Sequence, residues 1–190
     1  MRNKYAFGEL VGNVFSLIVT VLFYRPARLV RRPIYIRGRK SMVIGRKMTL
    51  GHSCRFDLEG KKKTLFIGDN CEFGDNVHIV ALKNVQIGNN VLIASKVFIS
   101  DTNHGSYKGE NQDSPLIPPR RRRLISDDVV IGNNVWIGEN VVILAGTTIG
   151  DGCVIGANSV VKGKYNRNEM IAGVPAHVIK AYSTKDNQWI

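Results

Sequence analysis

The sequence has only three cysteines, Cys54, Cys71 and Cys153, and no two of them form a CxxC pair. No cysteine and histidine cluster has zinc-ligand spacing either, which disfavours both a disulfide scaffold and a structural zinc site. The chain also lacks the GxxxxGK(S/T), GxGxxG and HExxH motifs. The usual evidence for ATP-driven, dinucleotide-dependent or zinc-protease chemistry is therefore missing.

Acidic residues are scarce, since 15 Asp and Glu stand against 27 Lys and Arg and leave a formal net charge of +12. Nucleic acid, an anionic membrane surface or an acidic substrate would each suit this charge, and composition does not choose among them. No nucleic-acid-binding motif accompanies it, so we expect no nucleic-acid partner. With 190 residues, of which 44% are hydrophobic, the chain can build the core of one domain.

A hydrophobic run long enough to span a membrane is also missing. The apolar segment 14–24 (VFSLIVTVLFY) is shorter than the roughly 20 residues that a spanning helix needs. Residues 1–47 hold eleven Lys and Arg, Arg2 and Lys4 among them, but one acidic residue, Glu9. We therefore expect residues 1–40 to form an apolar and basic helical segment. It either caps the main domain or lies on an anionic membrane surface.

Most of the remaining chain follows a period of six residues. The clearest series of apolar residues at this interval are Ile67, Phe73 and Ile79, then Ile87, Ile93 and Ile99, then Ile131, Ile137, Ile143, Ile149, Ile155 and Val161. An α-helix cannot use this period, because six residues rotate about 600°. A short strand followed by a tight turn can. The turn positions read GDN, GNN, GEN, GDG and GAN, and these residues tolerate left-handed backbone angles.

Three such strands make one triangular coil, and coils stacked about 4.8 Å apart pair their backbones and bury the apolar residues inside. The sequence therefore predicts an all-β fold, a parallel β-helix of about five coils, over residues 41–165. Residues 166–190 are expected to form a C-terminal tail. Each cysteine stands four residues after a repeat residue, in the slot for small side chains, so we predict that all three lie in the core.

At this point the chain resembles the hexapeptide-repeat acyltransferases. The resemblance lies mainly in segments 87–107 (IGNNVLIASKVFISDTNHGSY), 131–161 (IGNNVWIGENVVILAGTTIGDGCVIGANSVV) and 171–180 (IAGVPAHVIK). Within this family the chain looks most like bacterial polysaccharide and lipopolysaccharide O-acetyltransferases and the galactoside and maltose acetyltransferases. The resemblance implies a left-handed β-helix, whereas the general crossover rule favours the opposite hand. It also implies direct transfer of acetyl from acetyl-CoA to a sugar hydroxyl.

The largest break in the period is an excursion loop, residues 101–128, which follows Ile99. A loop of this length in a compact domain is usually functional. His104 lies near its start and, by the resemblance, matches the family's general base. An imidazole titrates near neutral pH and can take the proton of a sugar hydroxyl as the oxygen attacks a thioester.

The resemblance implies four further contacts with the sugar acceptor. They are expected from the loop residues Asn103 and Tyr107 and from His78 and Trp136. For His78 a solvent-facing corner is the alternative, and for Trp136 a packed coil face. Galactoside-type members carry an asparagine where this chain has Gly74, so we expect a different sugar.

The resemblance also implies a binding site for the donor. Trp136, Ala157, Lys162 and Lys180 match positions at which the family holds coenzyme A. Lysines can meet the anionic phosphates of coenzyme A as point charges, although exposed lysines are common without such a role. The sequence does not decide whether the donor carries a longer acyl group or is an acyl carrier protein.

The family further implies a homotrimer with sites between subunits. The basic N-terminal segment leads us to expect a cytoplasmic protein that contacts the inner face of the membrane peripherally. The sequence does not decide the role of the run Arg120–Arg123. It is a solvated face, a contact to an acidic glycan or nucleotide sugar, or a contact to coenzyme phosphates or another subunit. Acylation of a small xenobiotic or amino acid, and a non-catalytic β-helix module, are the alternative functions. The γ-class carbonic anhydrases need three metal-binding histidines, and His78 and His104 lack a third, so we expect no metal.

Overall fold

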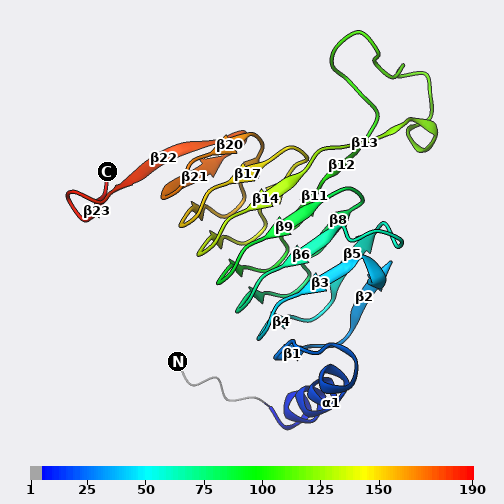
Figure 1. Ribbon diagram of the computed structural model, residues 1–190, viewed down its shortest axis with the longest axis vertical. Helices are drawn as coiled ribbons and strands as arrows, with labels where there is room; N and C mark the ends of the chain where they lie inside the picture. Colours follow the sequence, from blue (N-terminus) through cyan, green and yellow to red (C-terminus); the bar gives the residue numbers. More distant parts are fainter. Residues whose placement is uncertain (1–5) are drawn as a thin grey trace.

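The computed structural model describes residues 6–190, so Arg2 and Lys4 lie outside the described residues. Figure 1 shows short strands stacked into a parallel β-helix, with a helix at one end and a long loop near the other. The predicted all-β fold class is thereby confirmed. Parallel pairing joins strands of successive coils in three sheets.

The first sheet contains β1 (Leu29–Val30), β4 (Thr49–Leu50), β7 (Glu72–Phe73), β10 (Leu92–Ile93), β15 (Trp136–Ile137), β18 (Val154–Ile155) and β21 (Glu169–Gly173). The second contains β2 (Ile34–Arg37), β5 (Cys54–Leu58), β8 (His78–Ala81), β11 (Phe98–Ser100), β16 (Val142–Ile143) and β19 (Val160–Val161). The third contains β3 (Met42–Ile44), β6 (Leu65–Ile67), β9 (Val85–Ile87), β14 (Val129–Ile131), β17 (Thr148–Ile149) and β20 (Lys164–Tyr165).

Equivalent repeat residues lie in register from coil to coil. In the first sheet Phe73 pairs with Ile93, which pairs with Ile137, and Ile137 pairs with Ile155. All four side chains are buried, so they form one continuous apolar column inside the prism. The parallel strands extend from β1 to β21 and make about seven coils rather than five. The extra coils escaped the sequence analysis because β1 and β2, for example, lack the repeat's Ile-Gly signature.

The corners contain the left-handed residues that the turn sequences predict. Asn70, Asn90 and Asn134 have φ angles of 58°, 56° and 55°. Their side chains stack in a ladder, in which Asn70 donates to Asn90 at 3.2 Å and Asn90 donates to Asn134 at 3.1 Å. Glycine is required beside them, because a Cβ added to Gly88 would lie 2.7 Å from the backbone of Gly132 in the next coil.

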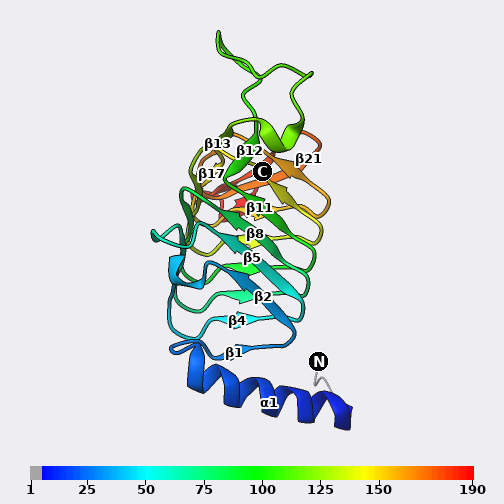
Figure 2. The same cartoon turned by 90° about the vertical axis from the view of Figure 1, so that its right-hand side faces the viewer.

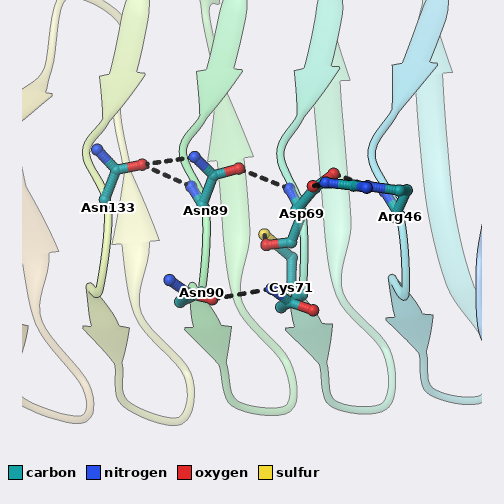
Figure 3. Close-up of polar contacts among 7 residues, drawn as sticks. Arg46, Asp69, Cys71, Asn89, Asn90 and Asn133 are labelled. Atoms are coloured by element: carbon teal, nitrogen blue, oxygen red, sulfur yellow. Dashed lines mark hydrogen bonds and ion pairs between the residues drawn. The ribbon is translucent and has the colours of Figure 1, made fainter.

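A second polar ladder runs along the same corner (Figure 3). The side-chain oxygen of Asn133 accepts hydrogen bonds from the backbone N–H and the side chain of Asn89, at 2.8 and 3.1 Å. Asn89 in turn accepts from the N–H of Asp69 at 2.7 Å. Asp69 accepts from the backbone N–H and the guanidinium of Arg46, which hold the pKa of its carboxyl below the usual range. Side chains thus satisfy turn N–H groups that the strand pairing leaves free.

The three cysteines are free and buried, as predicted. Desolvation by burial raises the pKa of Cys54 to about 11 and also raises those of Cys71 and Cys153. Thiols of this kind stay protonated at neutral pH and are not nucleophiles.

The helix α1 (Phe7–Phe23) crosses the end of the β-helix next to β1, as Figure 2 shows. Ser16 and Thr20 are buried against this end. The hydroxyl of Thr20 accepts a hydrogen bond from the N–H of Val30 in β1 at 2.9 Å and donates to the carbonyl of Ser16 at 2.6 Å. The helix therefore covers the first coil, as the capping alternative predicts. Among the described residues no helix is long and apolar enough to cross a membrane.

Two antiparallel additions complete the fold. The first sheet ends with β22 (Ala176–Ser183), which folds back along β21, and β23 (Gln188–Trp189). The excursion loop rests on a separate pair of strands, β12 (Thr102–His104) and β13 (Leu124–Ser126). Two short 3₁₀ helices, η1 (Arg39–Ser41) and η2 (Pro119–Arg121), lie in the first coil and in the loop.

Candidate active site

The antiparallel pair at the base of the excursion loop holds the backbone of His104. The loop leaves the second sheet after β11 and projects from the side of the β-helix (Figures 1 and 2). At its base Asn103 pairs with Ile125 and His104 pairs with Leu124. The His104 side chain is exposed, and its imidazole has no hydrogen-bond partner within residues 6–190. A fixed backbone thus carries an imidazole that is free to meet a substrate.

A buried carboxylate anchors the start of the loop. Asp101 is fully buried, and its side chain accepts hydrogen bonds from the N–H groups of Leu82, Lys83 and Asn84 at 3.0, 2.7 and 2.9 Å. The carbonyl of Asp101 accepts from the N–H of Asp127 at 2.9 Å, which closes the loop. Sequence reasoning missed this residue. The available signal was an aspartate placed directly after the strand where the period breaks.

Arg122 holds the loop against the backbone of His104 through a tyrosine. The hydroxyl of Tyr107 donates to the carbonyl of His104 at 2.5 Å, and Arg122 donates to the Tyr107 oxygen at 2.7 Å. Arg122 also donates to the carbonyls of Ile117 and Pro115, at 2.8 and 3.2 Å. One guanidinium therefore ties two other places in the loop, Ile117 and Pro115, to Tyr107 and, through it, to the residue expected to act as base.

A second arginine stabilises the same loop. Arg123 donates to the carbonyl of Asn111 at 2.9 Å and lies 3.6 Å from the carboxylate of Asp113. The N–H of Ser106 donates to Asp113 at 2.8 Å, and this bond, with the charge of Arg123, holds the pKa of Asp113 below its usual range. Two residues of the run Arg120–Arg123 thus have structural partners in the loop. The side chains of Arg120 and Arg121 are exposed.

Three of the predicted site residues line one hollow beside the base of the loop. Asn103, Tyr107 and Lys162 contribute to a hollow of about 420 Å³, which Gly105 and Gly163 also line. Asn103 and Gly105, the chain neighbours of His104, line this space, whereas His104 is not among the described residues that line it. Successive side chains of a strand point to opposite faces, and His104 follows Asn103 on β12. Lys162 comes from a coil later in the sequence, so stacking of the coils creates this arrangement.

A second hollow lies on the first sheet and has mostly apolar walls. Trp136 on β15 is 53% exposed, and with Ala157, Met170 and Ile179 it lines a space of about 460 Å³. Lys180 is adjacent, since it pairs with Met170 across β21 and β22. Trp136 projects from the outer surface and is not packed inside the coil. In one chain this hollow involves the first sheet, whereas His104 belongs to the loop that leaves the second.

His78 lies apart from both hollows, on the outer face of the second sheet. It is half-buried on β8 rather than at a corner, with its Nε2 3.1 Å from the carboxylate of Asp57 and its ring 5.2 Å from that of Phe98. Arg55 and Arg37 also pair with Asp57. Burial alone would raise the pKa of Asp57, but the hydrogen bonds from Arg55 and His78 outweigh it and lower the pKa. His78 is therefore already engaged by an acidic partner.

No group of three or more metal-ligating side chains lies together in the described part of the chain. In the region described, His78 and His104 have no third histidine placed with them.

Comparisons with known proteins agree with the repeat architecture. Residues 128–163 match the family model of the bacterial transferase hexapeptide (six repeats), and residues 65–100 match that of the hexapeptide repeat of succinyl-transferase. The chain is 45% identical over 190 residues to the Escherichia coli K12 protein named "Putative lipopolysaccharide biosynthesis O-acetyl transferase WbbJ", covering 100% of this chain and 96% of that one. The chain belongs to the hexapeptide-repeat transferase family. Like these relatives, it is an acyltransferase.

Two solved acyltransferase structures share the fold. A galactoside acetyltransferase in complex with coenzyme A has a TM-score of 0.56 and 25% identity, covering 97% of this chain and 87% of that one. AntD, an N-acyltransferase from Bacillus cereus in complex with dTDP-4-amino-4,6-dideoxyglucose and coenzyme A, has a TM-score of 0.71 and 22% identity, covering 98% and 94%. The likeness to AntD extends over nearly the whole chain and supports the fold alone.

Proposed function

We propose that this transferase moves an acetyl group from acetyl-CoA directly to a sugar hydroxyl of a bacterial surface polysaccharide or its precursor, with His104 as general base. The observation that carries the proposal is the exposed imidazole of His104 on the β12–β13 base, which has no hydrogen-bond partner among the described residues. Its chain neighbour Asn103 lines a hollow together with Tyr107 and Lys162. This hollow is open enough to admit a sugar. The cysteines are buried and protonated, which favours direct transfer over an acyl-enzyme.

In the proposed step His104 takes the proton of the sugar hydroxyl while the oxygen attacks the thioester carbonyl. The bond from the carbonyl carbon to sulfur breaks, the acetyl ester forms, and the coenzyme leaves as a thiolate. The imidazolium then returns its proton to that thiolate, so the enzyme ends the cycle unchanged. Asn103 and Tyr107 would contact the acceptor beside the base.

The second hollow has the chemistry that the coenzyme arm needs. Trp136 and Ala157 offer apolar surface to the pantetheine chain, and Lys180 at its rim offers positive charge to the phosphates. Lys162, the other expected coenzyme contact, lines the first hollow of the same chain. Since the second hollow and His104 lie on different sheets of one chain, we propose that a homotrimer unites them across a subunit boundary. The imidazole of His78 is bonded to the carboxylate of Asp57, so His78 is a weaker candidate for acceptor contact.

The polysaccharide acceptor is supported by the full-length similarity to the lipopolysaccharide biosynthesis relative. A second relative, the Escherichia coli K12 protein named "Putative colanic acid biosynthesis acetyltransferase WcaF", is 26% identical over 87% of this chain and 84% of that one. We place the reaction in the cytoplasm, where the basic first coil could approach membrane-bound precursors.

The test measures acceptor-dependent release of free thiol from acetyl-CoA by the full chain. The acceptors are free sugars, nucleotide sugars and polysaccharide fragments, with amino sugars and amino acids included to detect N-acylation. His104→Gln keeps the size of the side chain but removes a usable base, so the turnover number should fall by about 10²–10⁴-fold. His177→Gln changes another exposed histidine, on β22, and should retain full activity.

Donor binding is measured separately by thermal shift with acetyl-CoA. Both the wild-type and His104→Gln should gain stability as the ligand concentration rises, because a ligand of the folded state stabilises it. A wild-type chain that gains no stability at millimolar acetyl-CoA would overturn the donor assignment. A His104→Gln variant within about threefold of wild-type turnover would overturn the base.

A further inference from the structure

The helix α1 packs on the β-helix with its polar face and leaves its apolar face uncovered. The residues turned toward the coil are mostly small or polar: Ser16 and Thr20 are buried, and the side chain of Asn13 accepts a hydrogen bond from Arg31 at 3.4 Å. Val19 is a partly buried apolar residue on this side and packs against the core. The arrangement as a whole is the reverse of an ordinary surface helix, in which the apolar stripe faces the core. The contact with the coil therefore does not explain why α1 is so apolar.

The uncovered face is large and continuous. Ten apolar residues of α1 are between 44% and 81% exposed. They are Phe7, Leu10, Val11, Val14, Phe15, Leu17, Ile18, Val21, Leu22 and Phe23. At 100° per residue most of them lie on the side of the helix opposite Ser16 and Thr20, with Val11 and Ile18 near the centre. An exposed apolar surface of this kind marks an interaction site.

Positive charge is concentrated in the part of the chain that contains this face. The first coil and α1, residues 6–47, contain nine basic residues and one acidic residue, whereas residues 48–190 contain sixteen basic and fourteen acidic. Arg25, Arg39, Lys40 and Lys47 are exposed, and within residues 6–190 no acidic side chain pairs with any of them. The N–H of Lys47 donates to the carbonyl of Pro26, which places it beside the end of α1.

Two arginines lie directly at the junction of the helix and the coil. Arg28 and Arg31 line a hollow of about 400 Å³ together with Leu17 and Val14 of α1. Arg28 is paired there with Glu72, whereas Arg31 has no acidic partner among the described residues. Arg31 thus stands at the border of the apolar face, where the headgroup phosphates of a lipid layer would lie when the apolar side chains enter the acyl region.

We propose that α1 is a membrane-docking helix, which lies flat in the interface of an anionic lipid bilayer. The first coil of the β-helix then faces the membrane. Figure 2 shows α1 running across the end of the coil stack, so its outer face is presented to a plane. At 17 residues it suits this position and does not span. The excursion loop lies toward the other end of the stack and stays away from the lipid.

A lipid surface fits this face better than a second copy of the chain. Two copies docked through α1 would bring two basic first coils together, and like charges oppose that contact. Anionic headgroups instead attract the same arginines and lysines while the acyl region takes the apolar side chains. An anionic bilayer is therefore the surface whose binding is favoured both by the basic residues and by the exposed apolar residues of this region.

The test is sedimentation of the full chain with vesicles, without donor or acceptor, so its result is independent of the proposed catalysis. Vesicles of phosphatidylcholine alone are compared with vesicles that contain about one quarter phosphatidylglycerol. We expect at least about tenfold stronger partition onto the anionic vesicles. Raising the salt from about 0.05 M to about 0.5 M should lower that partition severalfold, because salt screens exposed charges.

Variants separate the apolar and basic contributions. The double variant Val11→Glu with Ile18→Glu should lower binding to anionic vesicles at least about tenfold, and Arg25→Gln with Lys47→Gln should lower it severalfold. Leu116→Glu with Val174→Glu changes two exposed apolar residues away from α1 and should bind as the wild-type does. Unchanged melting temperatures would show that all variants stay folded.

Equal binding to neutral and anionic vesicles, or a Val11→Glu, Ile18→Glu variant that binds as the wild-type does, would overturn the proposal. Light scattering in solution tests the alternative that α1 is an interface between copies of the chain. If this variant alone lowers the molar mass of the particle, α1 is an interface between copies of the chain, and the membrane assignment falls.

Discussion

The coils of the β-helix and the excursion loop are held together in different ways. In the coils each short strand pairs with the strands before and after it, and a column of buried aliphatic side chains repeats the same contact. In the loop, residues 101–128, most of the ordering contacts come from a few charged or polar side chains, chiefly Asp101, Arg122 and Asp113. Stability therefore resides in the coils, and the loop is free to carry site-specific chemistry.

This difference has a physical basis in the neighbours available to each residue. A coil residue has an equivalent residue above and below it, so one sequence pattern satisfies both backbone and side chain. A loop residue has no such neighbour, and its backbone groups must find individual side-chain partners or water. Substitutions in the two regions should accordingly alter different properties of the protein.

The largest effect is expected from a cavity in the column of coil residues. Ile143 is fully buried between Ile99 and Val161, so Ile143→Ala should lower the free energy of unfolding by about 2–5 kcal/mol. Leu116, in the loop, is 91% exposed, and Leu116→Ala should change it by less than about 0.5 kcal/mol. Denaturant unfolding of both variants measures the contrast. Similar losses in the two would contradict the division between coil and loop.

The loop substitution with the largest expected effect should act on activity rather than stability. Arg122→Ala removes the hydrogen bonds to Tyr107, Ile117 and Pro115, so the loop should lose its fixed position beside His104. We expect kcat/KM for acetyl transfer to fall by about tenfold, equivalent to about 1.4 kcal/mol, mainly through kcat.

Arg121→Ala is the matched control, because that side chain is exposed and its neighbouring backbone is the same η2 turn. Its kinetics should equal those of the wild-type, and both variants should keep the wild-type melting temperature. Arg122→Lys should recover only part of the activity, since lysine cannot donate to three sites at once in a planar fork. A fully active Arg122→Ala variant would show that the activity does not depend on the hydrogen bonds of Arg122 within the loop.

A smaller effect is expected at a corner of the coils. Asn90 has a φ of 56° and bonds to Asn70 and Asn134, so Asn90→Ala should lower the free energy of unfolding by about 1 kcal/mol. Asn90→Gly keeps the left-handed backbone accessible and should cost less. Asn111→Ala, in the loop, should leave stability unchanged, because only the backbone carbonyl of Asn111 is used by Arg123. Equal losses at both asparagines would contradict the role of the ladder.

The smallest effect is a dependence of loop order on pH. The folded-state pKa of Asp113 is lowered by the N–H of Ser106 and by Arg123, so its contribution to stability is complete above the ordinary aspartate pKa of about 3.9. That contribution is lost as the pH falls through the lower, folded-state value. The amide resonance of Ser106 should therefore titrate below about pH 3.9, and Arg123→Gln should move its midpoint upward. A midpoint above the ordinary value would contradict the assignment.

The sequence could predict the coils because their rule is local. Each apolar residue in the six-residue series from Ile131 to Val161 predicts its own strand, and each turn asparagine predicts its own corner. The first coil was missed, since β1 (LV) and β2 (IYIR) lack the Ile-Gly signature of the repeat and are recognised as coil strands through their pairing with β4 and β5. His104 was singled out by the family resemblance and by its place near the start of the loop, whereas no pattern in the sequence indicated the contacts of Arg122.

Periodicity alone thus determined that the chain stacks short strands into a prism, since no other regular structure buries an apolar residue at every sixth position and turns between. Only the tertiary structure decided which residues lie together outside that repeat. It placed Lys162 beside Asn103 and Tyr107, tied Arg122 to the carbonyl of His104 through Tyr107, and turned the apolar face of α1 outward. Each of these contacts joins residues without a shared period, so it depends on the packing of the whole chain rather than on its local pattern.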